Sequence, residues 1–373
     1  MIYLDNAATT RPEGDAVEKA MHFLQDDFFN PSALYREGFA AHKELEEARK
    51  NILAHIASAA DFDLIFTASG SEADNQALFC SVSRGNIVTT EGEHAAVFNS
   101  AKELIRRGTD VRFAKLNADG SVNLENLLSL IDKNTSLVSV IHVNNETGAV
   151  NPVGEIAKQV KLKNNKNLFH SDGVQAFGKV PFKLNREMDL YSVSAHKIGG
   201  VRGAAALFFK KNLHIRPLVC GGGQEKGLRS GTENMFAIKQ FEFAAEKKFS
   251  SLEEDFRKIA EINRYFRENL QPDIFTILSS PQASPYILSV SAQGLRGEVL
   301  LHMLNDEGIV VGTGSACSSK NRYSRVMLAC GLSEKAADGV LRISFSAKTT
   351  MDEAVQAVEI MNRCAGQLAE RMR

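Results

Sequence analysis

Short apolar runs alternate with amphipathic stretches over the first two thirds of the chain, and this alternation limits the fold more than any other feature. The apolar runs, rich in β-branched residues, predict strands at Asp63–Thr67, Asn86–Thr89, Asp110–Ala114, Leu137–Val143, Leu168–Asp172, Leu190–Ser194 and Ala205–Phe209. The stretches between them predict helices at Glu72–Ser83, Ala95–Arg107, Leu124–Ile131 and Val153–Lys163. Strands that alternate with helices indicate an α/β fold with a doubly wound, mostly parallel, seven-stranded sheet that has helices on both faces.

After about residue 250 the pattern changes to that of a smaller α+β domain. Helices are expected at Leu252–Leu270, at Arg296–Asn305 and from Met351, and strands at Ile274–Leu278, Tyr286–Val290, Ile309–Gly312 and Leu341–Ser344. The boundary is expected inside the helical stretch Ala237–Leu270. We therefore expect a large domain of residues 15–250, and a small domain of residues 1–14 and 251–373 that carries a loop around Cys317.

The composition argues against several classes of function. With 44 basic and 45 acidic residues the net charge is −1, which gives no electrostatic reason for binding nucleic acid or a membrane surface directly. No apolar run approaches the ~20 residues that span a bilayer. The first ten residues, MIYLDNAATT, have neither the basic nor the apolar part of a signal peptide, so we expect a cytoplasmic protein.

The five cysteines are widely spaced and odd in number: Cys80, Cys220, Cys317, Cys330 and Cys364. This pattern is typical of neither a zinc site nor a disulfide framework, and no metal site is expected. Most of these residues are expected to be small buried hydrophobes. Cys317 differs, because the sequence around it is rich in glycine and serine, which favours a loop that exposes its sulfur.

Functional residues are expected directly after strands, because ligands of doubly wound sheets bind at the carboxyl ends of the strands. Lys197 follows the predicted strand that ends at Ser194, and it stands next to His196. A lysine in a partly dry cleft can form a Schiff base with an aldehyde cofactor. Taken alone, the same short sequence also suits a solvated turn.

Two other strand ends supply groups that such a cofactor needs. The segment Phe66–Asn75 runs from a strand through small hydroxyl residues into a helix, whose first N–H groups and Ser71 hydroxyl can bind a phosphate; an ordinary helix cap is the alternative. Asp172 can pair with a protonated pyridine nitrogen, and Gln175 can hydrogen-bond a 3-hydroxyl, although Asp172 also suits a helix cap. Together with Lys197, these groups predict pyridoxal 5′-phosphate as the cofactor.

The ordered motifs resemble those of the cysteine desulfurases of the class V aminotransferase family, which share the pyridoxal-phosphate fold type I. The resemblance covers essentially the whole chain, and it rests on Tyr3–Thr10, Phe66–Asn75, Glu93-His94, Asn144–Gly148, Asp172–Gln175, Ser194–Lys197, Gly221–Glu225, Arg229–Thr232, Gly314–Ser318 and Arg342–Ser344. It implies an enzyme that converts L-cysteine to L-alanine. It also implies a homodimer that passes sulfur to an acceptor protein, either an iron–sulfur cluster scaffold or a tRNA-thiolating enzyme.

The resemblance assigns the chemical steps to a few residues. Lys197 would carry the cofactor and later act as acid and base, and His94 would stack on the pyridine ring and shuttle a proton. Asp172 and Gln175 would tune the ring. The thiolate of Cys317 would attack the sulfur of the bound cysteine and become a persulfide.

The resemblance also assigns the binding residues. The cofactor phosphate would be held by Gly70, Ser71, Ser194 and His196. Thr232 would reach the phosphate in the partner subunit across a dimer interface. The substrate carboxylate would be bound by Asn145, which also faces the cofactor, and by the planar fork of Arg342, with Asn6 beside them.

Two departures from the family pattern bear on the function. Gly200–Gly203 contains Val-Arg where the family usually has Pro-Lys, without loss of a catalytic group. The segment Ser318–Arg325 is basic and slightly shorter than in the best-known members. Because this loop would deliver the persulfide, the sequence leaves the acceptor open.

Three alternative functions remain open from the sequence: a lyase acting on selenocysteine, an aminotransferase of small amino acids, and a non-catalytic scaffold for a sulfur-carrier protein. The aminotransferase reaction needs no thiol, so Cys317 argues against it. The presence of Lys197, Asp172, His94 and Arg342 together argues against a silent scaffold.

Overall fold

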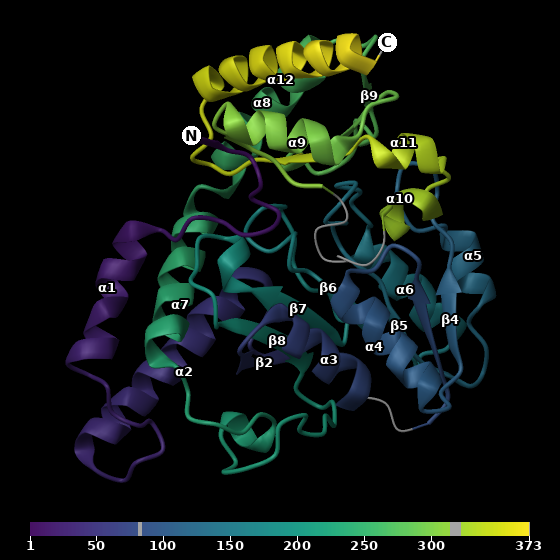
Figure 1. Ribbon diagram of the computed structural model, residues 1–373. Coiled ribbons are helices and arrows are strands. Elements are labelled where there is room, and N and C mark those ends of the chain that lie inside the picture. The colour runs from purple at the N-terminus through teal and green to yellow at the C-terminus, as the bar shows by residue number, and fades with distance from the viewer. Residues whose placement is uncertain (81–83, 314–321, 373) are drawn as a thin grey trace.

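A seven-stranded sheet forms the centre of the computed structural model, which describes residues 1–80, 84–313 and 322–372 (Figure 1). The strand order is β2-β8-β7-β6-β5-β3-β4. The bounds are β2 (Phe62–Thr67), β3 (Asn86–Thr90), β4 (Val111–Ala114), β5 (Thr135–Ser139), β6 (Leu168–Asp172), β7 (Leu190–Ser194) and β8 (Ala205–Lys210). The strands from β4 to β7 pair in parallel, and β8 is antiparallel to both of its neighbours. The prediction of a mostly parallel, seven-stranded α/β sheet is confirmed.

Helices cover both faces of this sheet. Side chains alternate across a strand, so Leu64 and Phe66 point to one face of β2 and Ile65 points to the other. The first face packs against α2, α6 and α7, and the second against α3 and α4. The helices of this part are α1 (Gly14–Gln25), α2 (Arg36–Ile56), α3 (Gly70–Cys80), α4 (Ala95–Arg106), α5 (Leu124–Ser129), α6 (Val153–Lys163) and α7 (Met235–Ser250), with the 3₁₀ turns η1 (Ala195–Lys197) and η2 (Glu225–Gly227).

Some boundaries differ from the predictions. The predicted helix Glu72–Ser83 corresponds to α3, and residues 81–83 lie outside the described residues. The predicted strand Leu137–Val143 corresponds to β5, which begins and ends earlier. Just beyond it, the N–H of Ile141 donates to Oε1 of Glu93 at 3.0 Å, while the N–H groups of Val140 and His142 still donate to the backbone oxygens of His170 and Asp172. The strand and helix pattern did not predict α1 and α2.

A second buried cluster lies above the carboxyl ends of the parallel strands (Figure 1). Its antiparallel sheet, in the order β12-β10-β9, packs against α8, α9 and α12, and the parallel pair of β1 with β11 brings the N-terminus to it. The elements are β1 (Ile2–Tyr3), α8 (Leu252–Asn269), β9 (Phe275–Ile277), β10 (Ile287–Ala292), α9 (Gly297–Asp306), β11 (Ile309–Val310), α10 (Arg325–Ala329), α11 (Glu334–Asp338), β12 (Val340–Ser344) and α12 (Met351–Met372).

The expected helical stretch Ala237–Leu270 is two helices, α7 and α8, separated at Ser251. The separate cluster built from the N-terminal strand and the elements after this break supports the expected division into residues 15–250 and residues 1–14 with 251–373, which stays a prediction.

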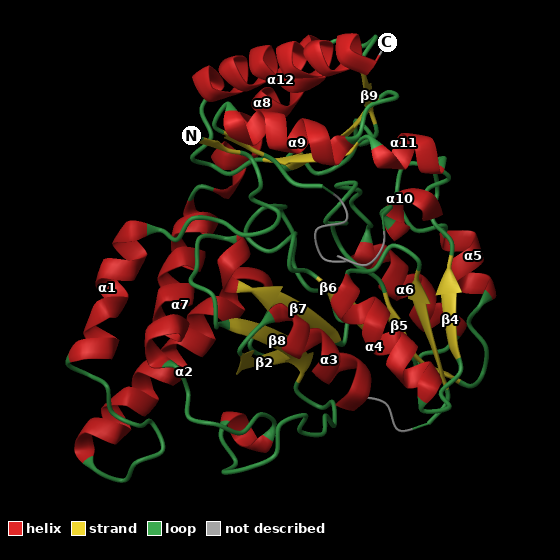
Figure 2. Cartoon of the chain, viewed as in Figure 1, coloured by secondary structure: helices red, strands yellow, loops and turns green. Residues whose placement is uncertain are grey.

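The carboxyl ends of the parallel strands point toward the second cluster. Figure 2 shows the arrow of β4 pointing toward the layer of α9, α11 and α12, and β3, β5, β6 and β7 run the same way. Residues that follow these strands therefore lie at the junction of the two parts. Among the described residues, no helix is both long and apolar enough to cross a membrane.

Candidate active site

Lys197 ends the short turn η1, which directly follows β7. Its Nζ donates to the backbone oxygens of Ala7, at 2.6 Å, and Ala8, at 2.7 Å. These two carbonyls belong to the N-terminal segment that returns from the second cluster. The amine therefore lies between the two parts of the molecule, where the sequence predicts a lysine that holds a cofactor.

His196 stands beside this lysine and is tied to the same N-terminal segment. Its Nδ1 lies 3.1 Å from Oγ1 of Thr9, and its backbone oxygen accepts from the N–H of Thr10 at 2.9 Å. Burial and the nearby Lys197 lower the pKa of His196 to about 4. The imidazole is therefore neutral at pH 7, and it can donate a single N–H to an anion.

Asp172 is the last residue of β6 and is buried. Its Oδ1 accepts from the N–H of Val174 at 2.9 Å, and among the described residues it forms no ion pair with a lysine or arginine. Burial raises the pKa of this carboxyl, against the opposing effect of His94. A buried carboxyl without a cationic partner is costly, so this position fits a group that brings a positively charged N–H.

His94 caps the N-terminus of α4: its Nδ1 accepts from the N–H of Ala96 at 3.2 Å. Burial lowers its pKa, and the Asp172 carboxyl opposes this shift. With Nδ1 acting as the acceptor, the proton of the neutral ring is on Nε2. His94 is thus a neutral ring beside a buried carboxyl, and its stacking on the cofactor stays a prediction.

The N-terminus of α3 lies where three distant segments meet. A Cβ atom added at Gly70 would lie 2.9 Å from Cγ2 of Val174 and 3.4 Å from Cβ of Ser194. Val174 follows Asp172, and Ser194 ends the strand that leads to Lys197. A side chain larger than glycine would collide with these residues, so the three segments pack closely here. The N–H of Glu72 donates to Oγ of Ser69 at 3.1 Å, as in the helix cap that the sequence left open, and the N–H groups of a helix start are also suited to an anion.

Ser71 and Ser194 differ in exposure at this position. The Ser194 side chain is buried, whereas Ser71, in the first turn of α3, is exposed. The structure thus brings the predicted phosphate-binding residues Gly70, Ser194 and Ser71 to one helix start. Their role in binding phosphate stays a prediction.

Arg342, on β12, brings a guanidinium to the same junction. Nη1 donates to the backbone oxygen of Asn145 at 2.9 Å, and Nη2 donates to Oδ1 of Asp5 at 2.8 Å. The buried Nε has no hydrogen-bond partner among the described residues. Because a guanidinium carries five N–H donors, it keeps donors for a carboxylate ligand.

Gln175 and Asn6 are both tied to backbone carbonyls. The Gln175 amide donates to the oxygen of Ala7 at 2.8 Å, the same oxygen that Lys197 contacts. The Asn6 amide donates to the oxygens of Ser344, at 2.9 Å, and Tyr3, at 3.2 Å. Asn6 therefore holds the N-terminal segment against β12, and its predicted contact with substrate is not tested by these bonds.

The structure does not bring two of the predicted residues into this group. Thr232 is exposed on the segment between β8 and α7, which is joined to α3 by an ion pair of 2.8 Å between Arg229 and Glu72. Cys317 lies outside the described residues.

Asp74, on the buried side of α3, was not among the residues predicted from the sequence. One oxygen of Asp74, one oxygen of Asp172 and one ring nitrogen of His94 all lie within 4.8 Å of one another. Burial, and then the Asp172 carboxyl, raise the pKa of Asp74 well above its usual value. Asp74 is four residues after Gly70, and that helical spacing was the available signal. Two carboxyls and an imidazole also form a possible metal ligand set, and the expected absence of a metal site stays a prediction.

The similarity of this chain to known proteins extends over its full length. The family model described as aminotransferase class-V matches residues 2–358. A cysteine desulfurase from Nostoc sp. is 34% identical, and the match covers 100% of this chain and 94% of that protein. A cysteine desulfurase from Clostridium botulinum is also 34% identical, with coverage of 99% and 95%.

Solved structures give the same result for the fold. A NifS-like protein superposes with a TM-score of 0.92 at 32% sequence identity, and the match covers 98% of this chain and 100% of that chain. A NifS-like protein from Rickettsia africae superposes with a TM-score of 0.90 at 29% identity, with coverage of 98% and 99%.

Proposed function

The chain belongs to the aminotransferase class-V family as a cysteine desulfurase that depends on pyridoxal phosphate, and from this premise we propose that it converts L-cysteine to L-alanine and leaves the sulfur on Cys317. One observation carries the proposal. The helix start at Gly70 lies against both the Asp172 turn and the end of the strand that leads to Lys197, within 2.9 and 3.4 Å of an added Cβ. The proposed phosphate site at Gly70, the proposed partner of the ring nitrogen at Asp172 and the Lys197 amine would therefore lie close together.

The described residues fit the cofactor. The helix start at Gly70 suits its phosphate, which Ser71, Ser194 and His196 would also contact. The buried Asp172 carboxyl, which lacks a cationic partner among the described residues, suits the protonated ring nitrogen. When bound, the cofactor supplies an electron sink next to the substrate's α-carbon.

Lys197 and His94 are the groups that move protons in this proposal. The Lys197 amine is held by two backbone carbonyls at the junction, so it is placed to hold the aldehyde and afterwards to take and return a proton at Nζ. His94 is neutral because burial lowers its pKa, so its ring can lie against the pyridine and accept a proton. Asp172 would keep the pyridine nitrogen of the bound cofactor protonated, and Gln175 would donate to its 3-hydroxyl.

Arg342 would bind the substrate carboxylate, together with Asn145 and with Asn6 beside them. Support comes from the orphaned Nε of Arg342, which is buried at the junction, and from its bond to the backbone oxygen of Asn145. If the substrate carboxylate binds here, the α-carbon of the amino acid would be directed toward Lys197. Binding at one end leaves the cysteine sulfur directed away from Arg342.

The proposed sulfur transfer needs no oxidant from outside the reaction. The Cys317 thiolate attacks the substrate sulfur, an S–S bond forms and the C–S bond breaks, so that Cys317 becomes a persulfide. The carbon keeps the electron pair of the broken bond and receives a proton, which gives alanine. The support is the resemblance and the glycine- and serine-rich sequence around Cys317. We further propose that the persulfide passes to an acceptor protein, with an iron–sulfur scaffold and a tRNA-thiolating enzyme both open.

The Cys317 assignment is tested by the variant Cys317→Ser. We expect it to keep the near-visible absorption of the bound cofactor while sulfide release from L-cysteine with a reductant falls by roughly 10²-fold or more, since no thiolate accepts the sulfur. The matched control is Cys220→Ser, which changes an exposed free cysteine and should leave the rate unchanged. Undiminished turnover in Cys317→Ser would move the sulfur to another residue.

The same assay separates the alternatives. An aminotransferase would release no sulfide, and its amino-group transfer would be unchanged in Cys317→Ser. A scaffold protein would release no sulfide even without the substitution. A preference for selenocysteine would appear as faster alanine formation from that substrate than from cysteine.

We also propose that the protein is a cytoplasmic homodimer in which Thr232 reaches the partner's cofactor phosphate. Exposed large apolar side chains between α1 and α2 support an interface, since such patches are uncommon on monomers. They include Phe28, at 69% exposure, and Leu34, at 103%. The exposed Thr232 side chain is free to contribute to such a contact.

A further inference from the structure

Lys179 is a buried amine that the proposed chemistry does not use. It ends the turn that starts after Asp172, its side chain is 5% exposed, and its Nζ donates to Oε1 of Gln175 at 3.0 Å. Among the described residues no carboxylate forms an ion pair with it. Burying an unpaired ammonium is costly, so this lysine calls for an explanation.

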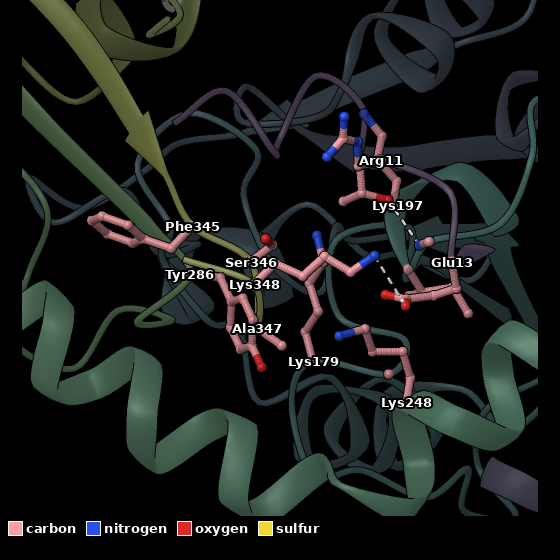
Figure 3. A pocket seen from close by; sticks show the side chains of 14 residues that line it. Arg11, Glu13, Lys179, Lys197, Lys248, Tyr286, Phe345, Ser346, Ala347 and Lys348 are labelled. Carbon is pink, nitrogen blue, oxygen red and sulfur yellow. Dashed lines mark hydrogen bonds and ion pairs between the residues drawn. The ribbon is translucent and has the colours of Figure 1, made fainter. Parts of the chain in front are cut away.

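The surroundings of Lys179 increase this cost. Figure 3 shows Lys179 in a small pocket with the side chains of Lys197, Lys248 and Lys348, and with a single carboxylate, Glu13. Arg11 lines the same pocket. Glu13 lies 3.1 Å from Lys348 and 3.1 Å from Lys247, so other cations already engage it.

Burial lowers the pKa of Lys179 well below its usual value, and the nearby charges of Lys197, Lys248 and Arg342 add to the effect. The pocket has a volume of about 30 Å³, which holds about one water molecule. Within the part of the chain that the structure describes, the charges around Lys179 do not favour its ammonium form, and its side-chain hydrogen bond is to the amide of Gln175.

That contact fixes which way the amide of Gln175 faces. At one end, Nε2 donates to the oxygen of Ala7 at 2.8 Å, and a carbonyl oxygen can only accept. At the other end, Oε1 receives the Lys179 amine. The Ala7 oxygen also accepts from Lys197 at 2.6 Å, so the amide nitrogen of Gln175 and the amine of Lys197 share one acceptor. The amide nitrogen of Gln175 therefore lies close to the Lys197 amine.

We propose that Lys179 is a positioning residue that holds the N–H side of the Gln175 amide toward Lys197, so that Gln175 donates to the phenolic oxygen beside the cofactor's aldehyde. The inference rests on the proposed cofactor site. Without Lys179 the amide keeps only its bond to the Ala7 oxygen as a constraint, so it rotates more easily and presents its oxygen to that phenolic oxygen, which also carries negative charge. This repulsion would raise the pKa of the protonated nitrogen that joins Lys197 to the cofactor.

The test is the pH dependence of the cofactor's near-visible absorption in the holoenzyme. In Lys179→Met we expect the midpoint of the absorption change to move to higher pH by about one unit, a tenfold change in the proton dissociation constant, as loss of one oriented hydrogen bond implies. The matched control is Lys248→Met. It removes an amine from the same pocket whose partner is Asp255, at 3.2 Å, and it should leave the midpoint unchanged.

A double-variant cycle separates positioning from the charge of Lys179. In a Gln175→Ala background we expect Lys179→Met to cause no further shift, because there is no amide left to orient. An equal shift in both backgrounds, or no shift in either, overturns the proposal. If Lys179→Met does not fold, Lys179→Ala is measured by the same criteria. Absence of any near-visible absorption in the unmodified protein would instead contradict the cofactor site itself.

Discussion

At the scale of single residues, burial decides the protonation states around the cofactor site. It raises the pKa of Asp172 and of its neighbour Asp74, and it lowers the pKa of His94 and His196. The result is a neutral, dry surrounding in which a single added charge has a large effect. The cation expected at Asp172 is the protonated ring nitrogen of the cofactor.

Asp172→Asn tests this directly. The amide cannot form the charge-assisted bond to the ring nitrogen, which contributes about 1.5–3 kcal/mol, so cofactor affinity should fall by roughly 10- to 100-fold in an absorbance titration. The thermal midpoint of the cofactor-free protein should not fall, because the substitution removes a buried ionisable group. Unchanged cofactor affinity would contradict the assignment of Asp172.

The sequence could predict the residues that directly follow apolar strands. Lys197 and Asp172 stand at the ends of the apolar runs that predict β7 and β6, and the structure places both where the parallel strands end. Asp74 and Lys179 could not be found in this way. Their charges lie in stretches that look like ordinary solvated helix or turn, and only packing against the sheet and the second cluster buries them.

At the scale of elements, local patterns predicted all the strands of the large sheet but not how their ends are held. Just beyond β5, the Glu93 side chain accepts from the N–H of Ile141, a contact between residues 48 positions apart. The two helices α1 and α2 pack on α7, which is far along the chain, and no short pattern indicates that pairing. Non-local contacts of this kind are absent from sequence periodicity.

One such contact holds the segment between β8 and α7. Arg49, on α2, donates to both carboxylate oxygens of Glu225, at 2.8 and 2.9 Å, and to the oxygen of Leu64 at 2.7 Å. Glu225 also accepts from the N–H of Phe66 at 2.7 Å and has a φ of +49°, which non-glycine residues rarely adopt. The buried pair therefore ties a strained turn to β2.

Arg49→Met should lower the free energy of unfolding by about 3–5 kcal/mol in urea titrations, because it leaves a buried carboxylate without its partner. Arg36→Met is the control on the same helix: its pair with Glu37 is exposed, and the cost should be about 0–1 kcal/mol. Adding Glu225→Gln to Arg49→Met should recover part of the loss. If the two arginine variants lower the free energy of unfolding equally, the buried pair contributes no more to stability than the exposed pair.

At the scale of the whole molecule, the candidate site depends on both buried clusters. The large sheet contributes Lys197 and Asp172, while the second cluster contributes Arg342. The N-terminal segment connects them, since the backbone oxygens of Ala7 and Ala8 accept from Lys197 and Asp5 pairs with Arg342 at 2.8 Å. Composition and periodicity could indicate two parts, but not that the first ten residues join them at the site.

The most direct test of the account is to locate the lysine that binds pyridoxal phosphate. The holoenzyme is reduced with borohydride, digested, and the modified peptide identified by mass spectrometry. We expect the pyridoxyl group on Lys197 alone, and none in Lys197→Ala, with Lys179 and Lys248 unmodified in both although they line the same pocket. A pyridoxyl group on any other lysine, or one that survives in Lys197→Ala, would contradict the central claim.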